Sequence, residues 1–194
     1  MGLIQSVKGW TPKIDSGVFI AESAVVIGDV TLGPDVSIWY QTVLRGDVGG
    51  IRVGARTNIQ DLTMIHCTGD GSETVIGEDV TVGHRAVLHG CTIEDETLIG
   101  MGAIVLDGAV VRRHVLVAAG AVVPPSATLE SGFLYAGVPA KKIKPLTDAR
   151  IAFFKESAAH YLSLKSCYGG EGRLTASKGI RPGRRRRLPR WRRS

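Results

Sequence analysis

Three of the chain's five histidines, His66, His84 and His89, lie close together in the sequence. Three neutral imidazoles that leave one coordination position open form a catalytic zinc site, and iron or cobalt also suits nitrogen ligands. His84 and His89 are five residues apart, whereas a helix face repeats every three or four residues and a strand face every two. Neither a helix nor a strand would therefore bring His84 and His89 of one chain to the same ion. The alternative to a metal site is three unrelated surface or core histidines.

Apolar residues recur at every sixth position through most of the chain. The first run is Ile20, Val26, Leu32, Ile38 and Leu44, and the rhythm returns from Val53, from Ile76, and from Ile93 to Val123. Small or β-branched residues follow four positions later: Ala24, Val30, Val36, Thr42 and Val48. A hexapeptide repeat of this kind is typical of a parallel β-helix. A β-sandwich would alternate with a period of two and would need more turn dipeptides.

The repeat predicts where side chains lie. We count each hexapeptide as one face and three faces as one coil, and we treat 49–52 and 67–75 as loops that leave the coil. Leu44, Ile65 and Leu88 then stack on one face. The residues that follow them are Arg45, His66 and His89, which form a column with a rise of about 4.8 Å.

His84 belongs to a different surface in this count. Ile59 and Val82 stack on the preceding face, so Asp61 and His84 follow them at equivalent positions, with Gln60 beside them. His84 cannot then reach an ion shared by His66 and His89 of its own chain. In a threefold assembly, His84 of a neighbouring subunit could complete the site.

The chain divides into three parts. Residues 1–145 are predicted to form the β-helix domain, and 146–168 an amphipathic helix capped by Thr147. The apolar stripe of that helix is Ile151, Phe154, Ala158, Tyr161 and Leu162. From Glu171 onward, nine arginines and one lysine stand against one glutamate. We predict that this basic tail, 169–194, is disordered. We favour a solvated or weakly anion-binding extension over nucleic-acid binding, because nothing else in the sequence resembles a recognition module.

No feature of the sequence indicates a membrane or an oxidising compartment. No apolar run reaches the roughly 18 residues that a membrane span needs, and the N-terminus lacks the apolar core of a secretory signal. Cys67, Cys91 and Cys167 are odd in number and show no C-x-x-C spacing. Reduced thiols and a cytoplasmic location are therefore expected. Cys67, next to His66, is either a metal ligand or a small buried residue, and we favour the second.

Three segments together carry a resemblance to a known family: LRGDVGGIRVGARTNIQDLTMIH, IGEDVTVGHRAVLHGCTI and LESGFLYAGVPAKKI. Over about residues 10–165 the chain resembles the γ-class carbonic anhydrases. The resemblance implies an all-β, left-handed parallel β-helix with a C-terminal α-helix, assembled as a homotrimer with zinc at the subunit interface. His66 and His89 would come from one subunit and His84 from its neighbour.

The resemblance also implies roles for other residues. Arg45 and Asp47 would hold the interface, and Gln60 would orient a metal-bound hydroxide or bicarbonate. Asn58 and Asp61 would be supporting polar residues, and Tyr135 would lie near the site. Arg45, Gln60, Asp61 and Tyr135 are thus the expected catalytic set beside the metal ligands.

The expected function is metal-dependent, reversible hydration of CO₂ to bicarbonate by a metal-bound hydroxide, the activity of a carbon–oxygen lyase. One departure affects turnover, because Val48 stands where well-studied members carry a proton-transfer glutamate. Three alternatives stay open: a hexapeptide-repeat acyltransferase, a thioesterase for coenzyme A esters, and a catalytically weak, metal-bound trimeric scaffold.

Overall fold

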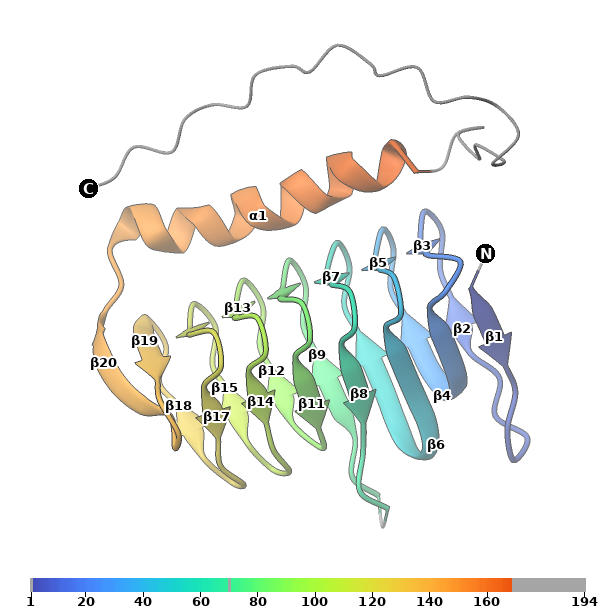
Figure 1. The fold of residues 1–194 in the computed structure, drawn as a ribbon, viewed down its shortest axis with the longest axis horizontal. Coiled ribbons are helices and arrows are strands. Elements are labelled where there is room, and N and C mark those ends of the chain that lie inside the picture. The colour runs from blue at the N-terminus through green and yellow to red at the C-terminus, as the bar shows by residue number, and fades with distance from the viewer. Residues whose placement is uncertain (1, 70, 169–194) are drawn as a thin grey trace, which may run out of the picture.

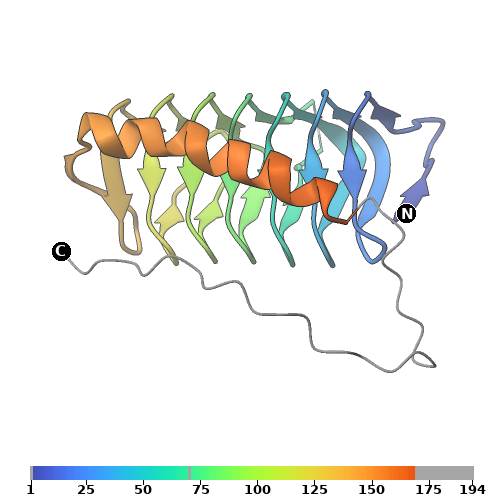
Figure 2. The same cartoon turned by 90° about the horizontal axis from the view of Figure 1, so that it is seen from above.

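The protein is a stack of short strands wound into a three-sided prism, with one helix laid along it (Figures 1 and 2). This computed structural model describes residues 2–69 and 71–168. Every strand pairing but the last, β19 with β20, is parallel among the strands of the described residues. The predicted left-handed parallel β-helix with a C-terminal helix is confirmed.

Each face of the prism is a ladder of strands from successive coils. The first face holds β1 (Leu3–Gln5), the beginnings of β4 (Val25–Leu32) and β6 (Val43–Val53), β8 (Met64–His66), β11 (Val87–His89), β14 (Ile104–Val105) and β17 (Val122–Val123). The second holds β2 (Lys13–Ile14), the ends of β4 and β6, β9 (Thr74–Ile76), β12 (Thr92–Ile93), β15 (Val110–Val111) and β18 (Thr128–Leu129). The third holds β3 (Phe19–Ile20), β5 (Ser37–Ile38), β7 (Asn58–Ile59), β10 (Thr81–Val82), β13 (Leu98–Ile99), β16 (Leu116–Val117), β19 (Phe133–Ala136) and β20 (Lys141–Pro145).

The interior consists of the sixth-position residues. Leu44 pairs with Ile65, and Ile65 with Leu88, as predicted. All three are fully buried. Burying a side chain of this size removes apolar surface worth about 1.5–3 kcal/mol, so the repeat itself supplies the driving force for coiling.

The segment 49–52 does not leave the coil as predicted. It belongs to β6, which runs without interruption through a corner of the prism. Gly46 pairs with Gly28, but the next pairing joins Ile51 to Val30, so extra residues bulge from β6 between these points. This bulge carries Asp47, and it leaves Val48 exposed, whereas the equivalent residues of the earlier hexapeptide repeats, such as Val30 and Thr42, are buried. The second predicted loop is shorter than expected, because β9 begins at Thr74.

Helix α1 (Asp148–Ser166) covers the third face and runs back toward the first coils (Figures 1 and 2). The Thr147 side chain accepts a hydrogen bond from the backbone N–H of Arg150, which makes it the predicted N-cap. Phe154 and Ala158 of the predicted stripe are fully buried, and the other members are partly buried. Within the described part of the chain, no helix is long and apolar enough to cross a membrane. The predicted disorder of 169–194 concerns residues outside those described.

Glu96 joins this helix to the coils. Its side chain accepts from His114 at 3.0 Å, pairs with Lys155 of α1 at 3.3 Å, and also pairs with Arg113. Burial would raise the pKa of the Glu96 carboxyl, but these hydrogen bonds outweigh burial and lower that pKa below its ordinary value of 4.5. The ionised form is therefore the one that stabilises the fold.

Replacing Glu96 by glutamine is expected to lower the free energy of unfolding at pH 7 by about 1–3 kcal/mol, the contribution of hydrogen bonds to a charged group. A carboxyl with a lowered pKa contributes stability above its unfolded-state pKa and loses it as the pH falls through the folded-state value. The difference between Glu96→Gln and the parent should thus shrink below about pH 4.5. Urea unfolding at several pH values tests this, with the exposed Glu156→Gln as the control. A difference that is independent of pH would contradict it.

Candidate metal centre

His66 and His89 end two adjacent strands of the first face. Their residues pair directly in the β8–β11 ladder. Nδ1 of His66 lies 3.2 Å from Nε2 of His89, and the ring planes are tilted by 56°. The predicted stacking of these two histidines is confirmed.

A carboxylate contacts the far nitrogen of each ring. Asp47 lies 3.1 Å from Nε2 of His66, and Asp107 lies 2.9 Å from Nδ1 of His89. If each outer nitrogen donates its proton to the carboxylate, two neutral rings face each other with lone pairs. Metal-bound histidines usually donate their second N–H to a carboxylate in this way. Two ligands with zinc–nitrogen bonds of about 2.0–2.1 Å lie roughly 3.3 Å apart in a tetrahedral site, so the pair fits a zinc ion.

The two carboxylates are held ionised by further partners. Burial opposes ionisation of Asp47, but hydrogen bonds from Arg45, at 2.8 and 2.9 Å, and from His66 lower its pKa. The hydrogen bond from Thr68 is the main reason that the pKa of Asp107 is lowered, and His89 adds to it. Arg45 therefore contacts Asp47, and Asp47 contacts His66, so both residues that we expected at the subunit interface adjoin the paired histidines.

His84 lies apart from this pair, as predicted. It occupies the turn before β11, whereas His89 is the last residue of that strand. Nδ1 of His84 contacts Asp61 at 2.8 Å, and the side chain is 42% exposed. Its Nε2 is thus available at the surface. Among the described residues, no group of three or more histidines, cysteines, aspartates and glutamates is arranged to hold a metal ion.

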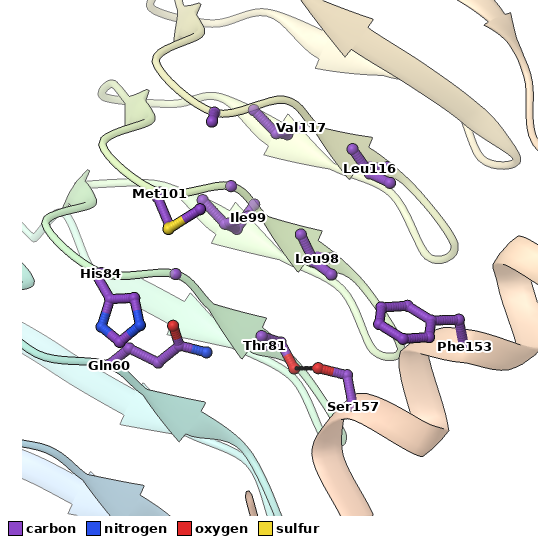
Figure 3. A pocket seen from close by; sticks show the side chains of 13 residues that line it. Gln60, Thr81, His84, Leu98, Ile99, Met101, Leu116, Val117, Phe153 and Ser157 are labelled. Atoms are coloured by element: carbon purple, nitrogen blue, oxygen red, sulfur yellow. Dashed lines mark hydrogen bonds between the residues drawn. The ribbon is translucent and has the colours of Figure 1, made fainter. Parts of the chain in front are cut away.

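An apolar groove of about 340 Å³ opens beside His84, between the third face and α1 (Figure 3). Gln60 lies at the His84 end of it and Phe153 at the helix end. The Gln60 amide donates to Asn58 Oδ1 at 3.1 Å, and Asn58 donates to Thr81 Oγ1 at 3.0 Å. Thr81 in turn hydrogen-bonds Ser157 of α1 at 2.9 Å (Figure 3). The expected polar residues Gln60 and Asn58 are therefore fixed through a chain of hydrogen bonds that ends on the helix.

Tyr135, which the resemblance implies near the site, lies in the interior of its own chain. It continues the interior column of the third face, in which Val82, Ile99, Val117 and Tyr135 follow one another. Three strand spacings of about 4.8 Å separate it from Val82. Its hydroxyl accepts from the backbone N–H of Glu130 at 2.9 Å. Tyr135 is thus a core residue, remote from the histidines of its own chain.

The remaining predicted residues have structural surroundings. All three cysteines are free, and Cys67 is buried with its Sγ donating to the carbonyl of Gly50. Burial raises the pKa of the Cys67 thiol, so the prediction of a small buried residue is the better one. His114 pairs with Glu96, and His160 is exposed on α1.

Two residues near the pair were not predicted. Asp107 contacts His89, and Thr68 donates to Asp107 at 2.7 Å. The repeat contains the signal for Asp107, because Val105 stacks on Leu88 and Asp107 follows it by two residues. Thr68 lies in the loop after β8, which the repeat does not describe.

The fold and the paired histidines define a hexapeptide-repeat β-helix with a candidate metal site at the corner of the prism. Comparison with known proteins narrows this class. No family model matches the chain. The chain is 54% identical to protein YrdA of Escherichia coli over 170 residues, which is 84% of this chain and 92% of that protein. It is 50% identical to the mitochondrial gamma carbonic anhydrase 1 of Arabidopsis thaliana, covering 82% of this chain and 60% of that one.

Solved structures agree with these relatives. A hexapeptide transferase family protein from Anaplasma phagocytophilum superposes with a TM-score of 0.82 at 43% identity, covering 86% of this chain and 98% of that one. The chain belongs to the γ-class carbonic anhydrase family.

Proposed function

We propose that the protein is a carbonic anhydrase that hydrates CO₂ reversibly at a metal site shared between subunits of a homotrimer. The observation that carries this proposal is the pair of facing nitrogens on His66 and His89, each backed by a carboxylate. Relatives named carbonic anhydrase, such as the 39% identical protein of Geobacillus kaustophilus, give the substrate class.

The ligand count supports a site shared between subunits. One chain offers two facing imidazoles and a third, exposed imidazole at the other end of β11. A catalytic zinc site takes three protein ligands. The exposed His84 of a neighbouring subunit is therefore the proposed third ligand, and its Asp61 partner would hold the ring with Nε2 outward. Zinc suits this set of nitrogen ligands, and iron or cobalt would also suit it.

The bound metal would supply a nucleophile at neutral pH by lowering the pKa of its water to about 7. The protein's residues bind and orient the reactants. Asp47 and Asp107 hold the imidazoles, and Arg45 holds Asp47. Gln60, only 6% exposed in the single chain, would orient the oxygen of the substrate at the lip of the groove.

The proton released by CO₂ hydration would leave the site through solvent. Val48 is exposed on the bulge next to Asp47 and cannot carry a proton. Glu73 is held in an ion pair with Arg52 at 3.1 Å. We therefore propose that buffer accepts the proton and that turnover depends on buffer concentration.

The test is stopped-flow CO₂ hydration by metal-replete protein purified without oxygen. Activity that is lost on chelation and restored by zinc, iron or cobalt supports the proposal. A trimer that binds metal but lacks activity would leave a scaffold. The similarity to a hexapeptide transferase family protein makes acyl transfer the second candidate. Release of free coenzyme A from acetyl-coenzyme A would reveal acyl transfer when it requires an amine acceptor, and thioesterase activity when it does not.

A further inference from the structure

Two carboxylates contact the paired histidines, Asp47 at His66 and Asp107 at His89. Neither the sequence motifs nor the resemblance gives a role to Asp107. It lies in the turn after β14, one coil beyond His89. Its two oxygens have separate partners: Oδ1 accepts from the Thr68 hydroxyl at 2.7 Å, and Oδ2 contacts Nδ1 of His89 at 2.9 Å. The carboxylate is thus fixed from two sides.

The turn after His89 leaves space for this carboxylate. Gly90 has a φ of +55°, a region that L side chains rarely adopt. A Cβ at this position would lie 2.4 Å from Asp107 Oδ1. The Gly90 N–H donates to Thr74 Oγ1 at 2.9 Å, and the same hydroxyl donates to the carbonyl of His66 at 2.7 Å. Glycine at 90 therefore permits the close approach of Asp107 to His89.

A second aspartate shows what the same arrangement does without a histidine. Asp95 lies over Gly77, where an added Cβ would be 2.2 Å from its Oδ1. That oxygen accepts the backbone N–H of Glu78 at 2.8 Å, so Asp95 stabilises a turn. Asp107 instead directs one oxygen to a histidine side chain and the other to a threonine side chain.

We propose that Asp107 is a positioning residue for the metal site, which fixes His89 as the Nδ1–H tautomer and so leaves Nε2 as the ligand atom facing His66. Thr68 holds the carboxylate in place. This inference rests on the metal site of the proposed function. Since outer carboxylate partners of metal-bound histidines contribute about 10–100-fold to metal affinity, Asp107→Ala should weaken zinc binding by about that factor.

The experiment measures zinc affinity of the full-length trimer by competition with a chromophoric chelator. Four variants are compared with the parent: Asp107→Ala, Asp107→Asn, Thr68→Val and the matched turn control Asp95→Ala. Asp107→Ala should give the largest loss. Asp107→Asn retains an acceptor and should recover part of the affinity, Thr68→Val should give a smaller loss, and Asp95→Ala should bind zinc as the parent does.

A second readout needs no metal. In the metal-free protein labelled with ¹⁵N-histidine, the parent should show His89 protonated at Nδ1, and Asp107→Ala should shift the population toward Nε2–H. An unchanged tautomer, or equal zinc affinity in Asp107→Ala and Asp95→Ala, would overturn the inference and leave the proposed function intact. If the parent itself binds none of zinc, iron and cobalt, both proposals fail.

Discussion

Replacing His84 by alanine is expected to abolish stable zinc binding, although His66 and His89 keep their positions in the same chain. His84 lies in the turn before β11 and does not contact the pair, so its loss leaves the facing nitrogens undisturbed. A third ligand should be worth more than the 10–100-fold of an outer partner, so we expect a loss of more than about 100-fold and CO₂ hydration at background level. Zinc content after dialysis measures the effect, and His160→Ala, on the exposed side of α1, is the control.

Mixing two inactive variants distinguishes a shared site from a site within one chain. When His84→Ala and His89→Ala chains exchange subunits, some interfaces combine His66 and His89 of the first with His84 of the second. Those interfaces hold a complete ligand set, so zinc binding and activity should return in part. Full zinc occupancy in His84→Ala alone, or no recovery in the mixed trimers, would contradict the shared site.

The sequence was sufficient for the parts of the fold that depend on burial. A residue such as Ile65 has to face the interior in every coil, so its partners Leu44 and Leu88 could be counted from the repeat. The bulge of β6 could not be predicted from the repeat, because residues 47–50 have no partner in β4 and do not follow the six-residue period. We treated 49–52 as a loop, whereas the backbone remains within the strand.

In the candidate site, too, the positions that follow the repeat could be predicted and the others could not. The column of His66 and His89 follows from the repeat, and so does the separate place of His84. Asp107 lies one coil later and two residues after Val105, so it is level with Gly90, and its contact with His89 depends on the room that Gly90 provides. A shared motif gives no distance along the stack, so the three coils that separate Tyr135 from Val82 within one chain could not be derived from it.

Replacing Leu88, which packs beneath the histidines, is expected to have a large effect on the free energy of unfolding. Leu88 is fully buried between Ile65 and Val105, and it immediately precedes His89. Leu88→Ala removes buried methylene and methyl groups in a close-packed column, so it should lower the free energy of unfolding by about 2–5 kcal/mol. Urea unfolding of the metal-free protein at one fixed chain concentration measures this, because an oligomer's stability depends on concentration.

The matched control is Leu3→Ala. Leu3 is 53% exposed on β1, so the same change in side chain should cost within about 0.5 kcal/mol. Equal effects of the two substitutions would contradict a close-packed interior. β11 carries both Leu88 and His89. The Leu88→Ala variant should therefore also bind zinc more weakly, because its interior is less closely packed. A variant that loses stability but keeps full zinc affinity would show that the β8–β11 pairing alone positions the histidines.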